Sequence, residues 1–85
     1  MKQILKEILD ESEYFEKNDE NIYIPRYLGI ILNSVVVFDV NWVIITDEEL
    51  MLMNEKVKTH PLASVHLKNV NSILMITEGG IKEIL

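Results

Sequence analysis

Cysteine is absent from this chain, and proline and glycine are scarce. The 85 residues include no Cys, two Pro and three Gly. Small secreted domains often depend on disulfides, so the lack of cysteine favours a reducing compartment, and we expect a cytoplasmic protein. The same lack excludes thiol catalysis and cysteine-based zinc sites.

Long hydrophobic runs are also missing. The longest apolar stretches, Tyr27–Leu32 and Trp42–Ile45, are far shorter than the roughly 20 residues that a membrane-spanning helix needs. The first residues alternate charged side chains with Ile and Leu, and they lack the apolar core of a signal peptide. We therefore expect neither a membrane span nor a secretory leader.

Positive charge is in short supply. Eight Lys and Arg face 14 Asp and Glu, which gives a net charge of −6. Binding to a phosphate backbone needs clustered basic residues, so direct contact with nucleic acid is not expected. An acidic surface suits a basic surface on another protein, although acidity can also serve solubility alone.

Enough apolar residues are present for one small core. Hydrophobic residues make up 48% of the chain and charged residues 26%, which is typical of a globular protein. A chain of this length predicts a single domain over residues 1–85.

Residues 2–16 are predicted to form an amphipathic helix. Apolar side chains recur there at the helical period, and polar side chains fill the other face. The apolar stripe consists of Ile4, Leu5, Ile8, Leu9, Ser12 and Phe15. We expect this stripe to face the core, and a partner groove is the alternative. The polar residues 17–21 are expected to end the helix and begin a loop.

The remaining residues predict about six short antiparallel strands. Strands are expected at residues 35–38, 42–45, 50–53, 57–59, 63–67 and 73–77, separated by polar turns. Residues 22–33 fit a strand or a short helix, and we favour the strand. The fold class is therefore α+β, with an N-terminal helix followed by an antiparallel sheet or a small barrel.

The sequence offers no arrangement of residues for catalysis. No serine lies in a nucleophile motif, and His60 and His66 are interpreted as surface residues. Two histidines alone make no metal site, and the acidic residues 47–49 lack the pattern of a calcium loop. We expect no enzyme activity, no cofactor and no metal.

The residues from 42 to 80 follow a recognisable order. An apolar strand ends in Thr46-Asp47, a second continues from Leu50, a Pro-Leu-x-x-Val step spans Pro61–Val65, and a last strand runs into a glycine turn within Ile73–Gly80. This order resembles the bacterial pleckstrin-homology-like (PH-like) domains. The resemblance implies a closed barrel of two orthogonal sheets and a structural or scaffold role, open to homo-oligomerisation. That family ends in a C-terminal helix, whereas the helix of this sequence is expected at the other end, and Ile81–Leu85 is expected to form a short strand or the first turn of a helix.

A second set of short segments indicates a different family resemblance. The segments are Glu20-Asn21-Ile22, Thr46-Asp47-Glu48, Met51-Leu52, Ile81-Lys82 and the final Leu85. Together with length and acidity, they are similar to the phage uracil-DNA glycosylase inhibitors, small acidic proteins that mimic DNA. This resemblance implies an open sheet backed by the N-terminal helix, with an exposed apolar cleft. Asn21 stands where that family has Ser, and extra residues precede Ile73.

The hypothesis that we favour is a non-enzymatic protein-binding domain, in its sharpest form a phage or mobile-element inhibitor of a host enzyme. The alternative is the PH-like module. The predicted partner-binding residues combine negative charge with an apolar anchor: Glu20, Ile22, Asp47, Glu48, Glu49, Met51 and Met53.

Overall fold

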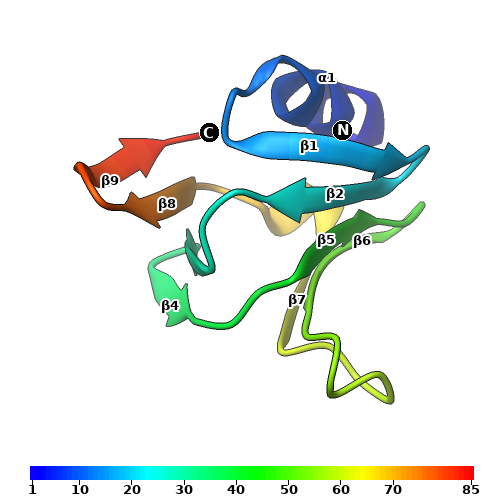
Figure 1. Ribbon diagram of the computed structural model, residues 1–85. Coiled ribbons are helices and arrows are strands. Elements are labelled where there is room, and N and C mark those ends of the chain that lie inside the picture. The colour runs from blue at the N-terminus through cyan, green and yellow to red at the C-terminus, as the bar shows by residue number, and fades with distance from the viewer.

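The chain folds into one α-helix and nine short strands that form two antiparallel sheets (Figure 1). The computed structural model describes residues 1–85. The elements are α1 (Lys2–Glu11), β1 (Phe15–Asp19), β2 (Ile22–Pro25), β3 (Gly29–Leu32), β4 (Val35–Val37), β5 (Trp42–Ile45), β6 (Glu49–Met53), β7 (Ala63–His66), a 3₁₀ helix (Leu67–Asn69), β8 (Ile73–Thr77) and β9 (Gly80–Glu83). The predicted α+β class with an N-terminal helix is confirmed.

The two sheets are open, and their strands are interleaved along the chain. The five-stranded sheet has the order β1-β2-β5-β6-β7, and the four-stranded sheet has the order β4-β3-β8-β9. After β2 the chain crosses to the second sheet, forms the β3–β4 hairpin and returns as β5. No closed barrel forms, so the predicted alternative of a small barrel is wrong, and the strands are more numerous than the six expected.

One hydrophobic core lies between the inner faces of the sheets and beneath α1. Fifteen buried side chains form a single cluster. They are Leu5, Leu9, Phe15, Tyr23, Ile30, Leu32, Val40, Val43, Ile45, Leu50, Leu52, Leu67, Val70, Ile73 and Met75. Alternate residues of β2, β5 and β6 point into this cluster, as the period of a strand requires.

The only α-helix, α1, is too short to span a membrane.

The helix is shorter than the sequence predicts. It ends at Glu11, and Ser12 adopts an extended conformation with φ −76° and ψ 132°. The Ser12 hydroxyl accepts a hydrogen bond from the Tyr14 amide at 3.2 Å, a local bond with which serine competes against helix. Phe15 then enters the core as the first residue of β1 and lies opposite Pro25. The prediction of a helix to residue 16 is therefore wrong, and of the loop expected within residues 17–21 only residues 20–21 form a turn, since 17–19 belong to β1.

Most of the other expected strands are confirmed, with one exception. Residues 22–33 contain the strands β2 and β3, as favoured. The period-two pattern beginning at Ala63 appears as β7, and β8 is an interior strand of its sheet. Residues 57–59 form no strand. Val57 makes only an isolated bridge to Asn54, because the Asn54 side chain accepts a hydrogen bond from the Lys56 amide and turns the chain there.

Candidate functional site

The outer face of the five-stranded sheet carries a continuous apolar surface, which we call the platform. It consists of Ile22, Ile24, Trp42, Ile44, Met51 and Met53. These residues alternate with core residues on β2, β5 and β6, so their side chains point away from the core. All six are half-buried.

Strand register places the platform residues in adjacent rows. Ile44 lies opposite Ile22 on one side and opposite Met51 on the other, and Trp42 lies opposite Met53. Cross-strand neighbours on one face have Cβ atoms roughly 5 Å apart, so their side chains pack against each other. The platform is therefore a fixed surface built on regular strands.

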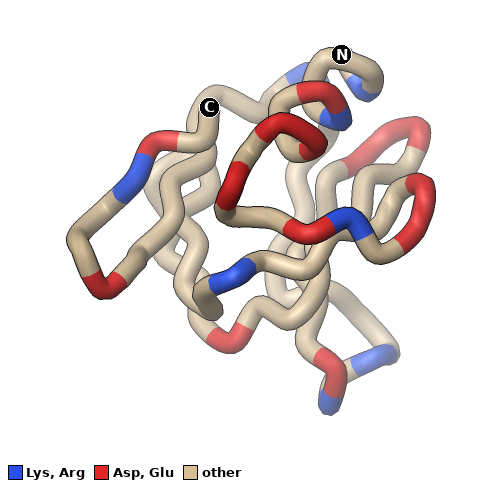
Figure 2. Tube along the Cα trace, turned by 45° about the horizontal axis from the view of Figure 1, so that its top comes forward, with Lys and Arg blue, Asp and Glu red and all other residues tan.

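Two acidic turns lie together at one end of this sheet. The turn from β1 to β2 carries Asp19 and Glu20, and the turn from β5 to β6 carries Asp47 and Glu48 (Figure 2). The two turns are joined through the backbone, since the Ile45 amide donates to the Asn21 carbonyl at 2.9 Å. The next residue along β6 is Glu49, which lies on the platform face.

Two lysines of α1 hold these turns against the helix. Lys2 Nζ lies 2.8 Å from Asp47 Oδ1, and Lys6 Nζ lies 2.7 Å from Glu20 Oε1. The hydrogen bond from Lys6 and its positive charge lower the pKa of Glu20, and the hydrogen bond and charge of Lys2 lower the pKa of Asp47. Both carboxylates remain exposed on their outer side, while Lys6 is nearly buried.

Tyr23 anchors the same helix to β2 from the core side. Its hydroxyl donates to Asp10 Oδ1 at 2.7 Å and approaches the Lys6 carbonyl at 3.4 Å. Lys17 of β1 lies 3.6 Å from the same Asp10 oxygen. Burial, with the Asp10 hydrogen bond, raises the pKa of Tyr23. The platform strand β2 is thus held rigidly on its inner side.

Acid is expected to loosen the contact between α1 and the two acidic turns. A carboxylate whose pKa is lower in the folded state than in the unfolded state stabilises the fold when the pH is above its ordinary pKa. The ordinary pKa is 4.5 for Glu20 and 3.8 for Asp47. The stabilisation is lost as the pH falls below that ordinary pKa and through the lower pKa of the folded state. We expect the urea midpoint to fall less steeply below pH 4.5 in a Glu20→Gln/Asp47→Asn variant than in the unmodified chain.

Glu78→Gln is the matched control for this acid titration, because Glu78 is an exposed acid in the β8–β9 turn without an ion pair. It should retain the full pH dependence. If the urea midpoint depended on pH in the same way in the double variant and in the unmodified chain, the stabilising role of these ion pairs would be contradicted. Added salt should reduce the difference in pH dependence between the two, since exposed ion pairs are screened.

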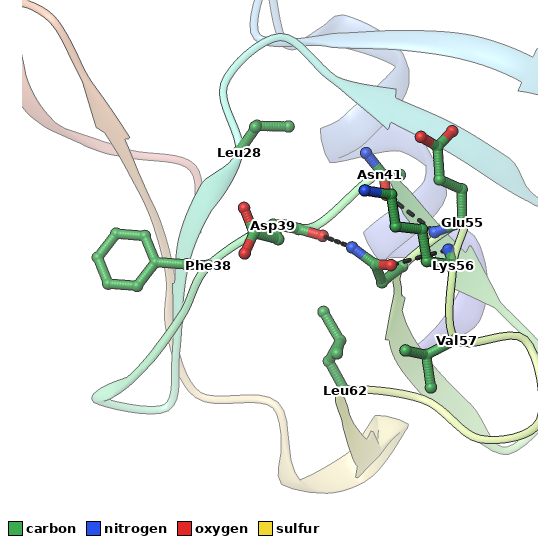
Figure 3. A pocket seen from close by; sticks show the side chains of 9 residues that line it. Leu28, Phe38, Asp39, Asn41, Glu55, Lys56, Val57 and Leu62 are labelled. Carbon is green, nitrogen blue, oxygen red and sulfur yellow. Dashed lines mark hydrogen bonds between the residues drawn. The ribbon is translucent and has the colours of Figure 1, made fainter.

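A second surface feature is a hollow of about 510 Å³ between the chain leading into β5 and the β6–β7 loop (Figure 3). Exposed Leu28, Phe38 and Leu62 form apolar parts of its wall. Its polar groups bond mainly to each other: Asn54 Nδ2 donates to the Asp39 carbonyl, and the Glu55 amide donates to Asn41 Oδ1, both at 2.8 Å. These bonds fix the loops, and the charged side chains of Asp39, Glu55 and Lys56 on the wall take part in no ion pair.

The structure gathers the predicted partner-binding residues on one side of the molecule. Ile22, Met51 and Met53 belong to the platform, Glu49 lies beside it, and the remaining three acids occupy the two acidic turns. Sequence reasoning missed Ile24, Trp42 and Ile44. Their alternation with Tyr23 and Val43 was the available signal, but apolar residues on both faces concealed which face was exposed.

The two histidines lie in different places: His66 lies opposite Glu49 on the outer face of the five-stranded sheet, and His60 lies in a loop. His60 is exposed in the β6–β7 loop and its Nδ1 lies 3.0 Å from the Thr59 hydroxyl. His66 ends β7 and its Nδ1 accepts a weak hydrogen bond from the Lys68 amide at 3.4 Å. No three His, Asp or Glu side chains come close enough together to hold a metal ion.

Comparisons of the chain with protein families, with curated proteins and with solved structures find no match.

Proposed function

We propose that this chain is a non-catalytic domain that binds another protein through the platform and the two acidic turns. The single observation that carries the proposal is the uncovered apolar face bordered by negative charge. Interfaces are enriched in aromatic residues and Met at their centre and in polar residues at their rim. Trp42, Met51 and Met53 fit the centre, and the acidic turns fit the rim.

The expected partner presents an apolar projection beside a basic surface. Five carboxylates lie at this end of the sheet, and only Glu20 and Asp47 among them are paired with lysine. Unpaired acids steer a basic partner toward the site and make its association sensitive to salt. Enzymes that bind DNA carry such basic grooves, because they must neutralise phosphate.

Inhibition of a DNA-binding host enzyme is therefore the form of this function that we favour. Open sheets are what the inhibitor resemblance implies and they support this form, although the platform is a sheet face and not the apolar cleft that the resemblance also implies. A PH-like scaffold module implied a closed barrel, which this chain does not form. The absence of cysteine agrees with action in the cytoplasm.

An inhibition assay with bacterial uracil-DNA glycosylase tests the favoured form directly. The chain is titrated into the enzyme, and uracil excision from an oligonucleotide is measured at low and high salt. We expect excision to fall to background near one equivalent of the chain at low salt, with weaker inhibition at high salt. Full excision in the presence of excess chain would eliminate inhibition of this enzyme, while leaving platform binding to be tested separately.

A further inference from the structure

We infer that the free edge of β4 pairs with the β4 edge of a second copy of this chain, so that two four-stranded sheets join into one. This edge belongs to the sheet that does not carry the platform, so the inference is independent of the proposed function. β4 lies at the margin of the molecule and pairs only with β3 (Figure 1).

The four sheet edges differ in their side chains. β1 carries Glu16, Lys17 and Asp19, and β9 carries Lys82 and Glu83, whereas β7 carries no acidic residue, lysine or arginine. Charged residues of this kind protect an edge from pairing with another chain. β4 consists of Val35, Val36 and Val37 and has neither charge nor proline. β4 is therefore the unprotected edge of the four-stranded sheet, and it is the most apolar of the four edges.

The backbone of β4 offers hydrogen bonds to an added strand. Asn33 and Ser34 have φ values of 49° and 69°, as in a two-residue hairpin turn that closes on a hydrogen-bonded pair. Since such pairs alternate with non-bonded ones, Val35 and Val37 direct their N–H and C=O groups to β3. The N–H and C=O of Val36 point outward from the free edge.

The edge is also held in place before any pairing. At the hairpin end, Asn33 Oδ1 accepts from the Asn71 amide at 2.7 Å and its Nδ2 donates to the Asn69 carbonyl at 2.8 Å. At the other end, Asp39 has φ 61°, and its carbonyl accepts from Asn54 Nδ2. A strand fixed at both ends loses little conformational entropy when another strand binds.

A second copy is the occupant that these features favour. Antiparallel pairing about a two-fold axis places Val36 opposite Val36 of the second copy, and Ser34 opposite Phe38 of the second copy. No charge meets a like charge, which a self-pairing edge requires. Val36 is 50% exposed and Phe38 62% exposed, and Phe38 already packs against Gly29 on the outer face. Pairing would cover these apolar side chains.

Sedimentation equilibrium of the full chain tests this inference. Because a pairing of this length buries less surface than a standard interface, we expect a dissociation constant on the order of 100 µM. The Val36→Lys variant should dimerise at least about tenfold more weakly, since it opposes two like charges and its fold should be unaltered by circular dichroism. The control Ile81→Lys, at a similarly exposed position on the β9 edge, should dimerise like the unmodified chain.

Cysteine crosslinking provides a second measurement. The chain has no other cysteine, and Cα atoms of a directly opposed pair are about 5.5 Å apart, within disulfide range. We expect oxidised Val36→Cys to form a covalent dimer far faster than Ile81→Cys. A chain that stays monomeric at millimolar concentration, or a Val36→Lys variant that dimerises as strongly as the unmodified chain, would overturn the inference.

Discussion

Replacing Tyr23 with alanine is expected to remove a large share of the stability of the domain. The side chain is fully buried within the core cluster that also contains Leu5 and Leu9 of α1. Truncating a buried aromatic residue typically costs about 3–5 kcal/mol in unfolding free energy, and a domain of this length has only about 4–13 kcal/mol. Urea unfolding followed by circular dichroism should show a midpoint far below that of the unmodified chain.

Tyr23→Phe separates the ring from the hydroxyl. This variant fills the core but loses the hydrogen bond to Asp10, so we expect a loss of about 1–2 kcal/mol. The raised pKa of Tyr23 gives a further difference at high pH. Stability from the neutral phenol is present below its ordinary pKa of 10.0 and is lost as the pH rises beyond it.

The phenylalanine variant should therefore lose less stability than the unmodified chain above pH 10.0. An alanine variant as stable as the phenylalanine variant would show that the ring contributes little to the core. Tyr27→Ala is a useful control, because Tyr27 only borders the core cluster and is half-buried. Its loss should be clearly smaller than that of Tyr23→Ala.

Replacing Met51 with lysine is expected to abolish tight binding to the partner proposed above. Met51 belongs to the platform and lies opposite Ile44 on one side and Ser64 on the other. Lysine there places a charge on the apolar platform and repels a basic partner. Losing an interface anchor costs about 2 kcal/mol or more, which is about thirtyfold in affinity. Isothermal titration, or inhibition where the partner is an enzyme, measures the change.

Leu74→Lys is the matched control for this substitution. Leu74 is also half-buried, lies on the outer face of an interior strand and belongs to the other sheet. Both variants should unfold at similar urea concentrations, while only Met51→Lys should lose the partner. Equal losses of binding in both variants would contradict the platform as the binding surface. A lysate protein retained equally by both immobilised variants would not qualify as its partner.

The sequence predicts elements better than it predicts their ends and their neighbours. Strands such as β5 and β8 were predicted within their observed bounds, because β-branched residues and polar turns mark them. The predicted helix was too long, because Phe15 continues the helical period of the apolar residues by coincidence. In the structure, Phe15 is buried as the first residue of β1. Tertiary packing decided between two local structures that the pattern allowed equally.

The candidate site was predicted only in part for a related reason. The acidic turns and the methionines are visible as local features, so Glu20, Asp47 and Met51 could be named. The pairing of β2 with β5 joins strands that are separated by a hairpin of the other sheet. No local signal encodes that neighbour relation, and it is what brings Ile22 beside Ile44 and completes the platform.

The interleaving of the two sheets also affects how the chain can fold during synthesis. β3 is an interior strand whose second neighbour is β8, so Gly29–Leu32 lacks one partner until Ile73–Thr77 has left the ribosome. The β1–β2 hairpin likewise waits for β5. Neither sheet can be completed from a continuous segment, and contacts of such long sequence separation slow folding. Folding should therefore be cooperative and should be completed only after most of the chain has left the ribosome. A fragment that contains only part of each sheet should not fold independently.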